Sequence, residues 1–585
     1  MALLLTILSL TTLVTSSVVH PSPGDSFELL ILHNNDMHAR FEQTSQLSGI
    51  CTPADRQAGR CYGGFPRVAH VVKEARRAAA SGEGPPVLYL NAGDTYTGTA
   101  WFTIYKWRIA AEFLNALQPD AVSLGNHEFD NGVSGLTPFI ENLTCPVLAA
   151  NLVLNKEPAL QAETNLRNSV IFQINSTKVG VIGYLTPETK VLAIGNNVEY
   201  IDETIAIRKE IVELKKQNVS IFIALGHSGF AKDLEIARDV EDIDLVIGGH
   251  TNTFLWNGTS PDTEKPTGPY PRIVNQTSGR LVPVVQAYAY TKYLGKLHLV
   301  FNSAGELVSY DGNPILLDKT IPQDPEVLLI INKYRDSVLK VSEVPVGNTS
   351  VVLDANPCRY KECNLGNMIT DAMVFRYASE YVGDGWTDSP IAIIQRGGIR
   401  ASISHIHLPA QVTYGDLLNV LPFDGSMMRV SINGSDVMRM FEHAVERYNP
   451  QRAPGEFLHM SGIKVIYDFK KRPGSRVTKV SVLCGKCKIP EYFPLNKTKE
   501  YMILMSSFIQ MGGDGYALFK TLPAVKLEYN ELDSLTDYVQ KHSPIYPAVE
   551  DRITMLHIDK IRNSAGFLTV SPLVVIIFLV TFISK

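Results

Sequence analysis

The sequence predicts an α/β protein of two large domains, and three observations support this class. The chain has 585 residues, which is more than one compact core usually contains. In its first half, short apolar runs such as LLILHNND and VGVIGYL alternate with helix-like stretches such as IAIRKEIVELKKQ, as they do in α/β domains. Residues 324–340 then form an amphipathic segment, with apolar positions at three- and four-residue spacing.

This amphipathic segment predicts how the chain is divided. It follows a polar, proline-containing stretch and precedes a strand-rich region. We therefore expect a helix at 324–340 that connects a domain at 18–323 with a second domain at 341–556. The chain is 45% hydrophobic and 19% charged, which is ordinary for a globular protein. Its formal net charge is only −5 and long basic runs are missing, so we expect no nucleic-acid partner.

The N-terminus is predicted to be a secretory signal peptide at 1–17. Residues 2–15 (ALLLTILSLTTLVT) are apolar, and the small residues Ser16 and Ser17 precede the polar HPSPGD. This order is typical of a signal peptide, although the positively charged start of such signals is missing. A buried N-terminal helix is the alternative.

The C-terminal region, 557–585, is predicted to carry a signal for lipid anchoring. Small residues at 563–566 precede a terminal apolar tail that Pro572 interrupts. The apolar tail is shorter than the ~20 residues that a spanning helix needs, and small residues before such a tail are typical of a GPI-attachment signal. We therefore expect an anchor on the extracellular face of the plasma membrane. A transmembrane anchor and a soluble secreted form are the alternatives.

Sequons and cysteines agree with passage through the secretory pathway. Eight N-x-Ser/Thr sequons lie at Asn142, Asn175, Asn218, Asn257, Asn275, Asn348, Asn433 and Asn496. Six of the seven cysteines form short-range pairs that suit disulfides in an oxidising compartment, namely Cys51/Cys61, Cys358/Cys363 and Cys484/Cys487. For the last pair, half of a zinc site is the alternative. Cys145 lies in an apolar run and is predicted to be a buried thiol.

Residues of metal-binding type follow five of the apolar runs. They are Asp36, His38, Asp94, Asn126, His227 and His250. In open α/β sheets, ligands gather beyond the carboxyl ends of the strands, so we expect these residues to meet at one edge of a sheet. Imidazole and carboxylate suit zinc, manganese or iron. Each residue alone is weak evidence, but the ordered set predicts a site for two divalent ions that can catalyse displacement at phosphorus.

The ordered blocks HNNDMHARFEQT, NAGDTYTGT, SLGNHEFDNG, ALGHSGF and VIGGHTN resemble the 5′-nucleotidase family of calcineurin-like metallophosphoesterases. The match covers nearly the whole mature chain. Within the family, the sequence resembles the animal, cell-surface members in particular. This resemblance implies an N-terminal domain of four α/β/β/α layers and a C-terminal α+β nucleotide-binding domain. It also implies zinc as the metal and a homodimer through the C-terminal domain.

The resemblance also assigns roles at the metal site. It implies that Asp36, His38 and Asp94 hold one ion, and that Asp94 bridges to a second ion. The second ion would also be held by Asn126, His227 and His250. His127 and Asp130 match the catalytic pair of the family: Asp130 would orient the imidazole, and protonated His127 would stabilise charge on the phosphoryl group or the leaving oxygen.

In the second domain, five residues are candidates for binding substrate. Taken alone, Phe423 and Phe508 would more often be core residues, and the glycine-rich segments around Arg400 and Asp514 would usually be turns. The resemblance implies instead that the two rings stack the nucleobase and that Asp514 binds the ribose. Arg359 and Arg400 would hold the ribose–phosphate portion.

Three residues of the second domain depart from the pattern of the family. Gln395 and Met511 stand where asparagine is common, and Arg396 stands where a small residue is common. Gln395 leaves the base preference open. Arg396 adds positive charge near the expected path of the phosphate, which would help a longer polyphosphate to bind.

The function that we expect is hydrolysis of extracellular nucleoside 5′-monophosphates, with AMP giving adenosine and phosphate. An apyrase that hydrolyses ATP and ADP is the alternative, but secreted apyrases of this type generally lack a C-terminal anchor signal. A catalytically silent nucleotide-binding protein is a third possibility. The sign of that class would be the loss of a metal ligand or of His127, and the sequence retains all of them.

Overall fold

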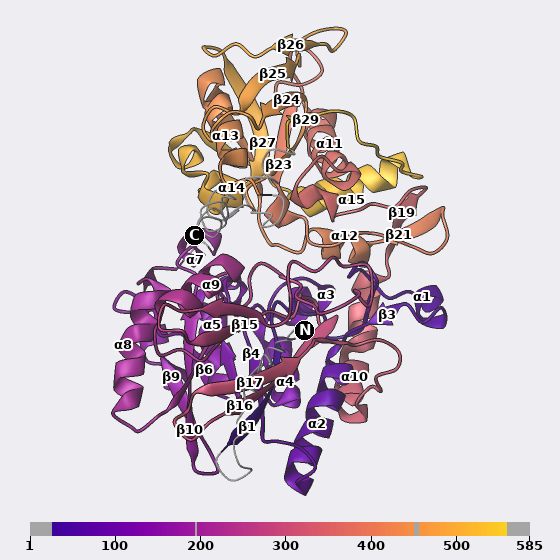
Figure 1. Cartoon of the computed structure of the whole chain (residues 1–585). Coiled ribbons are helices and arrows are strands. Elements are labelled where there is room, and N and C mark those ends of the chain that lie inside the picture. Colours follow the sequence, from indigo (N-terminus) through magenta and orange to yellow (C-terminus); the bar gives the residue numbers. More distant parts are fainter. Residues whose placement is uncertain (1–25, 194–195, 450–454, 559–585) are drawn as a thin grey trace, which may run out of the picture.

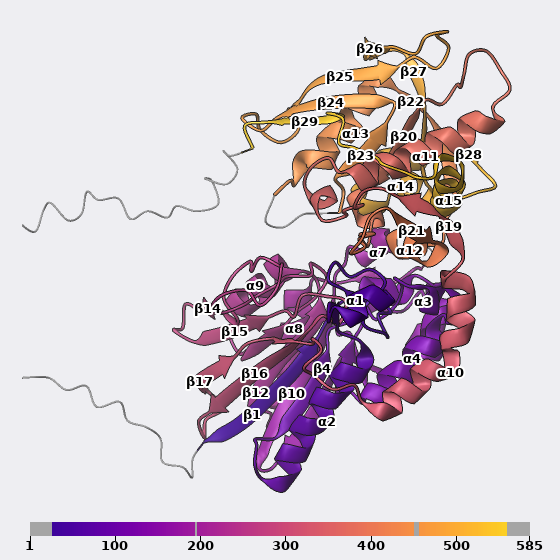
Figure 2. The ribbon, with the colours of Figure 1, turned by 90° about the vertical axis from the view of Figure 1, so that its right-hand side faces the viewer.

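The computed structural model describes residues 26–193, 196–449 and 455–558. The predicted signal peptide and nearly all of the predicted anchor region lie outside these residues. The described chain forms two domains, and helix α10 (Pro325–Ser342), which lies along one side of the N-terminal domain, connects them (Figures 1 and 2). Asp324 caps this helix by accepting hydrogen bonds from the backbone N–H groups of Glu326 and Val327, both at 3.1 Å. In the described part of the chain, every helix is too short or too polar to cross a bilayer.

The N-terminal domain contains two β-sheets that pack face to face. The first has the strand order β17 (Leu307–Gly312), β16 (Tyr293–Phe301), β1 (Phe27–Asn34), β4 (Val87–Asn91), β5 (Ala121–Ser123), β6 (Val147–Leu148) and β8 (Leu166–Arg167), with β18 (Ile315–Leu316) beside β16. The second has the order β14 (Arg272–Asn275), β15 (Leu281–Val285), β13 (Leu245–Ile247), β12 (Ile221–His227), β10 (Thr177–Leu185) and β9 (Ser169–Ile174). Leu29 and Leu90 of the first sheet share a buried cluster with Val181 and Ile223 of the second.

Helices cover the outer faces of both sheets. Helices α2 (Phe65–Ser81), α4 (Trp107–Leu117) and α5 (Gly132–Asn142) pack on the first sheet, while α8 (Glu203–Lys215) and α9 (Phe230–Asp239) pack on the second. The central strands are therefore buried on both faces, which explains why they are nearly continuous apolar runs in the sequence. The predicted four-layer α/β/β/α arrangement is confirmed.

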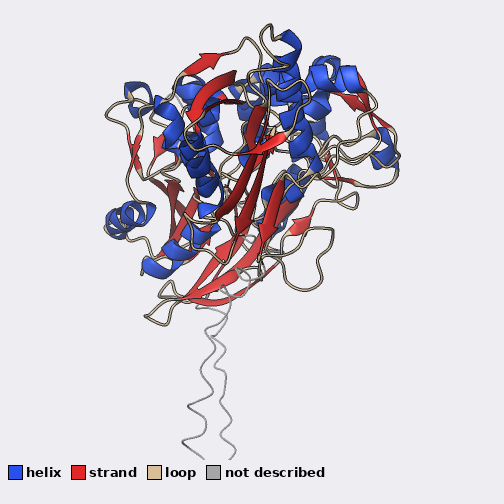
Figure 3. Ribbon diagram, turned by 90° about the horizontal axis from the view of Figure 1, so that it is seen from above, coloured by secondary structure: helices blue, strands red, loops and turns tan. Residues whose placement is uncertain are grey.

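The C-terminal domain has an α+β architecture, as predicted. One sheet has the order β23 (Leu458–Ser461), β20 (Ile391–Gln395), β27 (Glu500–Ser506), β22 (Met427–Asn433) and β28 (Ala524–Lys526). A second has the order β26 (Tyr492–Pro494), β25 (Val477–Leu483), β24 (Ile463–Asp468) and β29 (Ile553–Leu556). Helices α11 (Asn364–Glu380), α13 (Gly434–Glu446) and α15 (Glu531–His542) lie beside these sheets (Figure 1). Seen from above, helices flank a central group of strands (Figure 3).

Shorter elements complete the described chain. The helices are α1 (Pro53–Gln57), α3 (Ala100–Tyr105), α6 (Pro158–Gln161), α7 (Thr189–Leu192), α12 (Tyr414–Val420) and α14 (Ser507–Gln510). The strands are β2 (Thr44–Ser45), β3 (Cys61–Tyr62), β7 (Leu152–Val153), β11 (Glu199–Tyr200), β19 (Pro345–Thr349) and β21 (Ala410–Thr413).

The cysteines pair as the sequence predicts. The disulfides are Cys51–Cys61, Cys358–Cys363 and Cys484–Cys487. Cys145 is a free, buried thiol. Burial raises the pKa of this thiol to about 12, so it stays protonated and unreactive at neutral pH.

An aromatic cluster beneath α2 and α4 gives a test of the core. The ring of Phe113 stacks on Phe41 at a centroid distance of 4.3 Å and meets Phe65 edge-on at 5.6 Å. Phe113→Ala should lower the free energy of unfolding by about 3–5 kcal/mol because it leaves a cavity. The control Leu329→Ala removes a side chain of which 69% is exposed and should change the stability by about 0.5 kcal/mol or less. Chemical denaturation measures both, and equal effects would contradict this account of the core.

Candidate active site

The residues of metal-binding type lie where strands of the two N-terminal sheets end. Asp36 and His38 follow β1, and Asp94 follows β4 in the first sheet. His227 is the last residue of β12 in the second sheet, and His250 follows β13. The sequence analysis expected a single sheet edge. The structure instead brings together the carboxyl edges of two sheets, because the sheets pack face to face with these ends on the same side (Figure 2).

Short distances join all six predicted ligands. The Nε2 atom of His227 lies 2.8 Å from Asp94 Oδ2 and 3.7 Å from Asp36 Oδ1. The Nε2 atom of His38 lies 3.8 Å from each of these two carboxylates. Asn126 and His250 complete the group, with Asn126 Oδ1 2.8 Å from His250 Nδ1. Separations of this size are those of donor atoms that can share cations about 2.0–2.2 Å from each of them.

The histidines are held so that one nitrogen faces the carboxylates. His38 Nδ1 donates towards the carbonyls of Tyr96 and Thr97, at 3.2 and 3.1 Å. His227 Nδ1 donates to the carbonyl of Ala92 at 2.6 Å. These bonds hold each ring by Nδ1 and direct Nε2 at the carboxylates, which is the arrangement that metal-binding histidines use. The donor set therefore fits divalent metal ions.

The charges of the site call for a cation. Burial raises the pKa of Asp36, and repulsion from Asp94 adds to the effect. Burial also opposes ionisation of Asp94, but His227 and other neighbouring histidines outweigh it, so the pKa of Asp94 is well below its usual value. Burial lowers the pKa of His250 to about 3, which leaves its imidazole neutral. Burial alone would lower the pKa of His227, but Asp94 and Asp36 outweigh it and raise the pKa to about 10. Metal binding at this histidine therefore displaces a proton, since neutral imidazoles and ionised carboxylates are the forms that bind metals.

The backbone at the site is strained. Asp36, His38, Asp94 and His250 have φ values of 49°, 47°, 58° and 76°, in the left-handed region that non-glycine residues rarely adopt. Hydrogen bonds between the loops hold this conformation: the N–H of Asp36 donates to Gly93 O at 3.0 Å, and that of His38 donates to Asp94 O at 2.9 Å. The loops after β1 and β4 therefore form one unit.

His127 and Asp130 form the predicted pair. His127 Nδ1 lies 2.8 Å from Asp130 Oδ2, and 14% of the His127 side chain is exposed. Burial alone would lower the pKa of His127, but the carboxylates of Asp130 and Asp94 outweigh it and raise the pKa. The imidazole ring of His127 also stacks on the ring of Phe423 in the C-terminal domain, at a centroid distance of 5.4 Å.

A cavity of about 830 Å³ lies between the two domains. It is lined by Asp94, Asn126, His127, Asp130 and His250 from one domain, and by Arg359, Arg400, Phe423, Phe508 and Asp514 from the other. The structure thus brings together the predicted catalytic and substrate residues. Asp36, His38 and His227 are almost completely buried behind this lining.

The substrate candidates Arg400 and Asp514 have different neighbours. The Nη2 atom of Arg400 donates to His38 Nε2 at 2.8 Å. The backbone carbonyl of Asp514 accepts from His443 Nε2 at 2.9 Å, and burial raises the pKa of the Asp514 carboxyl to about 7. Arg396 also lines the cavity. Burial lowers the pKa of Arg396 to about 9, and the nearby Arg359 and Arg400 add to the effect.

Two ion pairs cross between the domains at the cavity. Lys106 of the N-terminal domain contacts Asp424 at 2.6 Å, and Glu188 contacts Arg447 at 3.0 Å. All four residues line the cavity. These four residues belong to no sequence motif and were not predicted. For Glu188 the sequence does contain a signal, because it closely follows the apolar strand run VGVIGYL.

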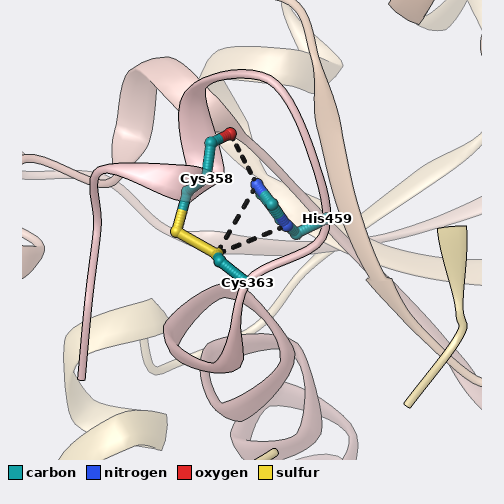
Figure 4. A group of neighbouring side chains, drawn as sticks. All are labelled: Cys358, Cys363 and His459. Carbon is teal, nitrogen blue, oxygen red and sulfur yellow. Dashed lines mark hydrogen bonds between the residues drawn. A yellow bond between two sulfur atoms is a disulfide. The ribbon is translucent and has the colours of Figure 1, made fainter. Parts of the chain in front are cut away.

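Cys358, Cys363 and His459 also form a cluster of metal-binding type, but the two cysteines form a structural disulfide. Cys358 and Cys363 are bonded to each other, so their sulfurs are not free to bind an ion (Figure 4). His459 lies against them and donates from Nε2 to the Cys358 carbonyl at 2.9 Å. Arg359 lies in the loop that this disulfide closes. The disulfide and the hydrogen bond from His459 therefore fix the backbone from which the Arg359 side chain extends into the cavity lining.

Comparisons with known proteins agree with this arrangement. Residues 29–254 match the model of the calcineurin-like phosphoesterase family, and residues 345–521 match that of the 5′-nucleotidase C-terminal domain. The fold and the site thus define a metallophosphoesterase. The chain is 42% identical to the 5′-nucleotidase of Bos taurus over 564 residues, which is 94% of this chain and 95% of the relative.

Two other proteins are similar over most of the chain. "Protein 5NUC" of Lutzomyia longipalpis is 46% identical over 537 residues, covering 91% of this chain and 93% of the relative. The crystal structure of a 5′-nucleotidase precursor from Thermus thermophilus has a TM-score of 0.81 and 29% identity, and the match covers 91% and 100% of the two chains. The chain therefore belongs to the 5′-nucleotidase family and is an enzyme. This confirms the resemblance found in the sequence.

The buried carboxylates predict that metal ions stabilise the fold. Folding brings the Asp36 and Asp94 carboxylates together, and a divalent cation relieves the repulsion between them. Such a cation should therefore bind the folded state and not the unfolded chain. At about 100 times its Kd it should then add about 2.7 kcal/mol to the free energy of unfolding. Asp94→Asn should lose most of this gain, while Asp537→Asn, on α15, should keep it. Thermal unfolding with added Zn²⁺ and with a chelator measures the difference. An equal melting temperature of the unaltered protein under both conditions would contradict the prediction.

Proposed function

We propose that this protein hydrolyses nucleoside 5′-monophosphates, with AMP as the main substrate, using two divalent metal ions. One observation carries the proposal: six residues of metal-binding type and the His127–Asp130 pair lie at one end of a cavity whose other side presents arginines, aromatic rings and a carboxylate. The relatives named 5′-nucleotidase support the same reaction.

In this proposal the six residues divide between two ions. Asp36, His38 and Asp94 would hold the first. Asn126, His227 and His250 would hold the second together with Asp94, which would serve both. The ions, with zinc as the expected metal, supply the Lewis-acid chemistry that activates water and neutralises charge on a phosphoryl group.

The protein's own residues supply proton and position. Asp130 holds the His127 imidazole by its Nδ1, so Nε2 is directed to the phosphoryl end of the cavity. A protonated His127 can donate a hydrogen bond to the phosphoryl oxygens, or a proton to the leaving ribose oxygen. Its raised pKa favours the protonated form. Arg400, beside His38, places a fixed fork of donors at the same end.

The nucleoside end of the proposed substrate lies in the C-terminal domain. Phe423 and Phe508 stack the base, and Asp514 accepts hydrogen bonds from the ribose hydroxyls. Arg359, on its disulfide-closed loop, contacts the ribose–phosphate portion. Because Phe423 stacks on His127 in this structure, base binding requires either its ring or the domain to move.

The remaining features of the proposal concern the whole molecule. We place the protein outside the cell, held by a GPI anchor whose signal lies in 557–585, with a signal peptide at 1–17. The domain boundaries are those expected from the sequence, 18–323 and 341–556, joined at 324–340. Glycosylation at some of the eight sequons and dimerisation through the C-terminal domain complete it.

Phosphate release from AMP, ADP and ATP tests the reaction. We expect rapid release from AMP, slow release from ADP and ATP, and none after a chelator removes the metal. Rapid release from ADP and ATP would instead indicate an apyrase. A metal-bound protein that releases phosphate from none of the three would be a binding protein.

Loss of the His127 imidazole should lower turnover but leave the metal in place. We expect His127→Ala to reduce kcat about 10²–10⁴-fold, the usual contribution of a general acid, with an unchanged metal content. His298→Ala, on β16, removes a partly exposed imidazole that pairs with Glu28 and should leave kcat unchanged. Near-normal turnover of His127→Ala would refute the assigned role.

The stacking role of Phe508 predicts an effect on substrate binding. Base stacking on an aromatic side chain contributes about 1–3 kcal/mol, so Phe508→Ala should raise the KM for AMP at least about fivefold and change kcat less. Phe493→Ala, on the exposed strand β26, is the matched control and should leave KM unchanged. If both variants keep the KM of the unaltered protein, Phe508 does not bind the base.

A further inference from the structure

We propose that Glu128 is a positioning residue, which locks together the two loops that carry Asp94 and Asn126 and thereby sets the metal affinity and the turnover of the site. This inference rests on the proposed function, because it assumes that these loops hold metal. Glu128 itself faces away from the cavity and is 1% exposed.

The Glu128 carboxylate accepts four backbone hydrogen bonds. Its Oε2 accepts from the N–H of Gly125 at 2.7 Å and from that of Asp94 at 2.9 Å. Its Oε1 accepts from the N–H of Thr95 at 2.7 Å and from that of Tyr96 at 3.2 Å. One donor lies in the loop after β5, and three lie in the loop after β4. A single side chain therefore joins the two loops.

Only an ionised carboxylate can satisfy this set of donors. Its two oxygens accept hydrogen bonds and donate none, and together they have about four lone-pair sites. A glutamine of the same size would turn its NH₂ group towards two N–H groups, so one side of the contact would become repulsive. The site thus selects glutamate by the number and direction of its acceptors.

The contact matters for the metal because it acts on Asp94. The N–H of Asp94 is bonded to Glu128, and Asp94 has a strained φ of 58°. On the side chain, Asp94 Oδ1 accepts from the N–H of His127 at 2.9 Å, which leaves Oδ2 facing His227. Glu128 thus fixes the backbone of the residue proposed to bridge the two ions.

The contact also acts on the second loop. Glu128 belongs to the short 3₁₀ helix η1 (Asn126–Phe129). This helix begins with Asn126 and His127, and Gly125 precedes it. The loops approach so closely that a Cβ atom on Gly125 would lie 2.5 Å from the backbone nitrogen of Asp94. Any loosening of the Glu128 contact would therefore displace a proposed ligand and the proposed acid together.

A matched pair of variants tests the proposal. Glu362 is also a buried carboxylate that accepts backbone hydrogen bonds, from Glu550 at 2.7 Å and Ile553 at 2.9 Å, but it lies in the C-terminal domain. Both Glu128→Gln and Glu362→Gln should lower the melting temperature. Only Glu128→Gln should weaken binding of Zn²⁺, roughly 10–100-fold, as is usual when a group that orients a metal ligand is lost.

The measurements separate positioning from mere stability. Zn²⁺ affinity is obtained by titrating metal-free protein against a chromophoric chelator below the melting temperature of each variant. At saturating Zn²⁺, Glu128→Gln should lower kcat about tenfold or more and leave the KM for AMP unchanged, because the nucleoside end is untouched. A Zn²⁺ affinity like that of Glu362→Gln, together with the kcat of the unaltered protein, would overturn the proposal.

Two further outcomes are informative. If Glu128→Gln does not fold, Glu128→Asp keeps the charge with a shorter reach and should show the same losses to a smaller degree, whereas normal Zn²⁺ affinity in this variant would overturn the proposal. If the unaltered protein binds Zn²⁺ but does not hydrolyse AMP, the proposed function fails, while the comparison of affinities still decides the role of Glu128.

Discussion

The candidate active site depends on two carboxylates, Asp36 and Asp94, that are buried beside each other. Water cannot screen their repulsion, so the fold must supply compensation from the surrounding protein. His227 contacts both carboxylates, and backbone N–H groups bond to each. Left-handed backbone at both residues aims the side chains inward. The arrangement is costly for the apo fold, and it creates a strong preference for cations in this place.

The sequence was sufficient to predict the class of fold and to single out six residues that the structure brings together, because both depend on local patterns. Apolar runs mark buried strands, so the polar residues that follow Asn34 or Ile247 within three positions lie at strand ends. The sequence did not reveal that β1 and β12 belong to different sheets. That depends on strand pairing over long separations in the chain, which alternation of apolar and polar residues does not encode.

The substrate side was less accessible to such reasoning. Phe423, Phe508 and Asp514 came from the family resemblance, because an aromatic residue near glycines has no pattern of its own. The stacking of Phe423 on His127 could not be foreseen, since it arises from the docking of one domain on the other. Glu128 was visible within GNHEFD, but only the structure shows that its acceptors face backbone donors rather than the cavity.

The two ion pairs between the domains have opposite polarity. The N-terminal domain contributes the cation in Lys106–Asp424 and the anion in Glu188–Arg447. If the C-terminal domain docked with these two contacts exchanged, Lys106 would meet Arg447 and Glu188 would meet Asp424, so like charges would face each other at both places. The charges therefore favour one orientation of the domains over the exchanged one, even though each exposed pair contributes little to stability.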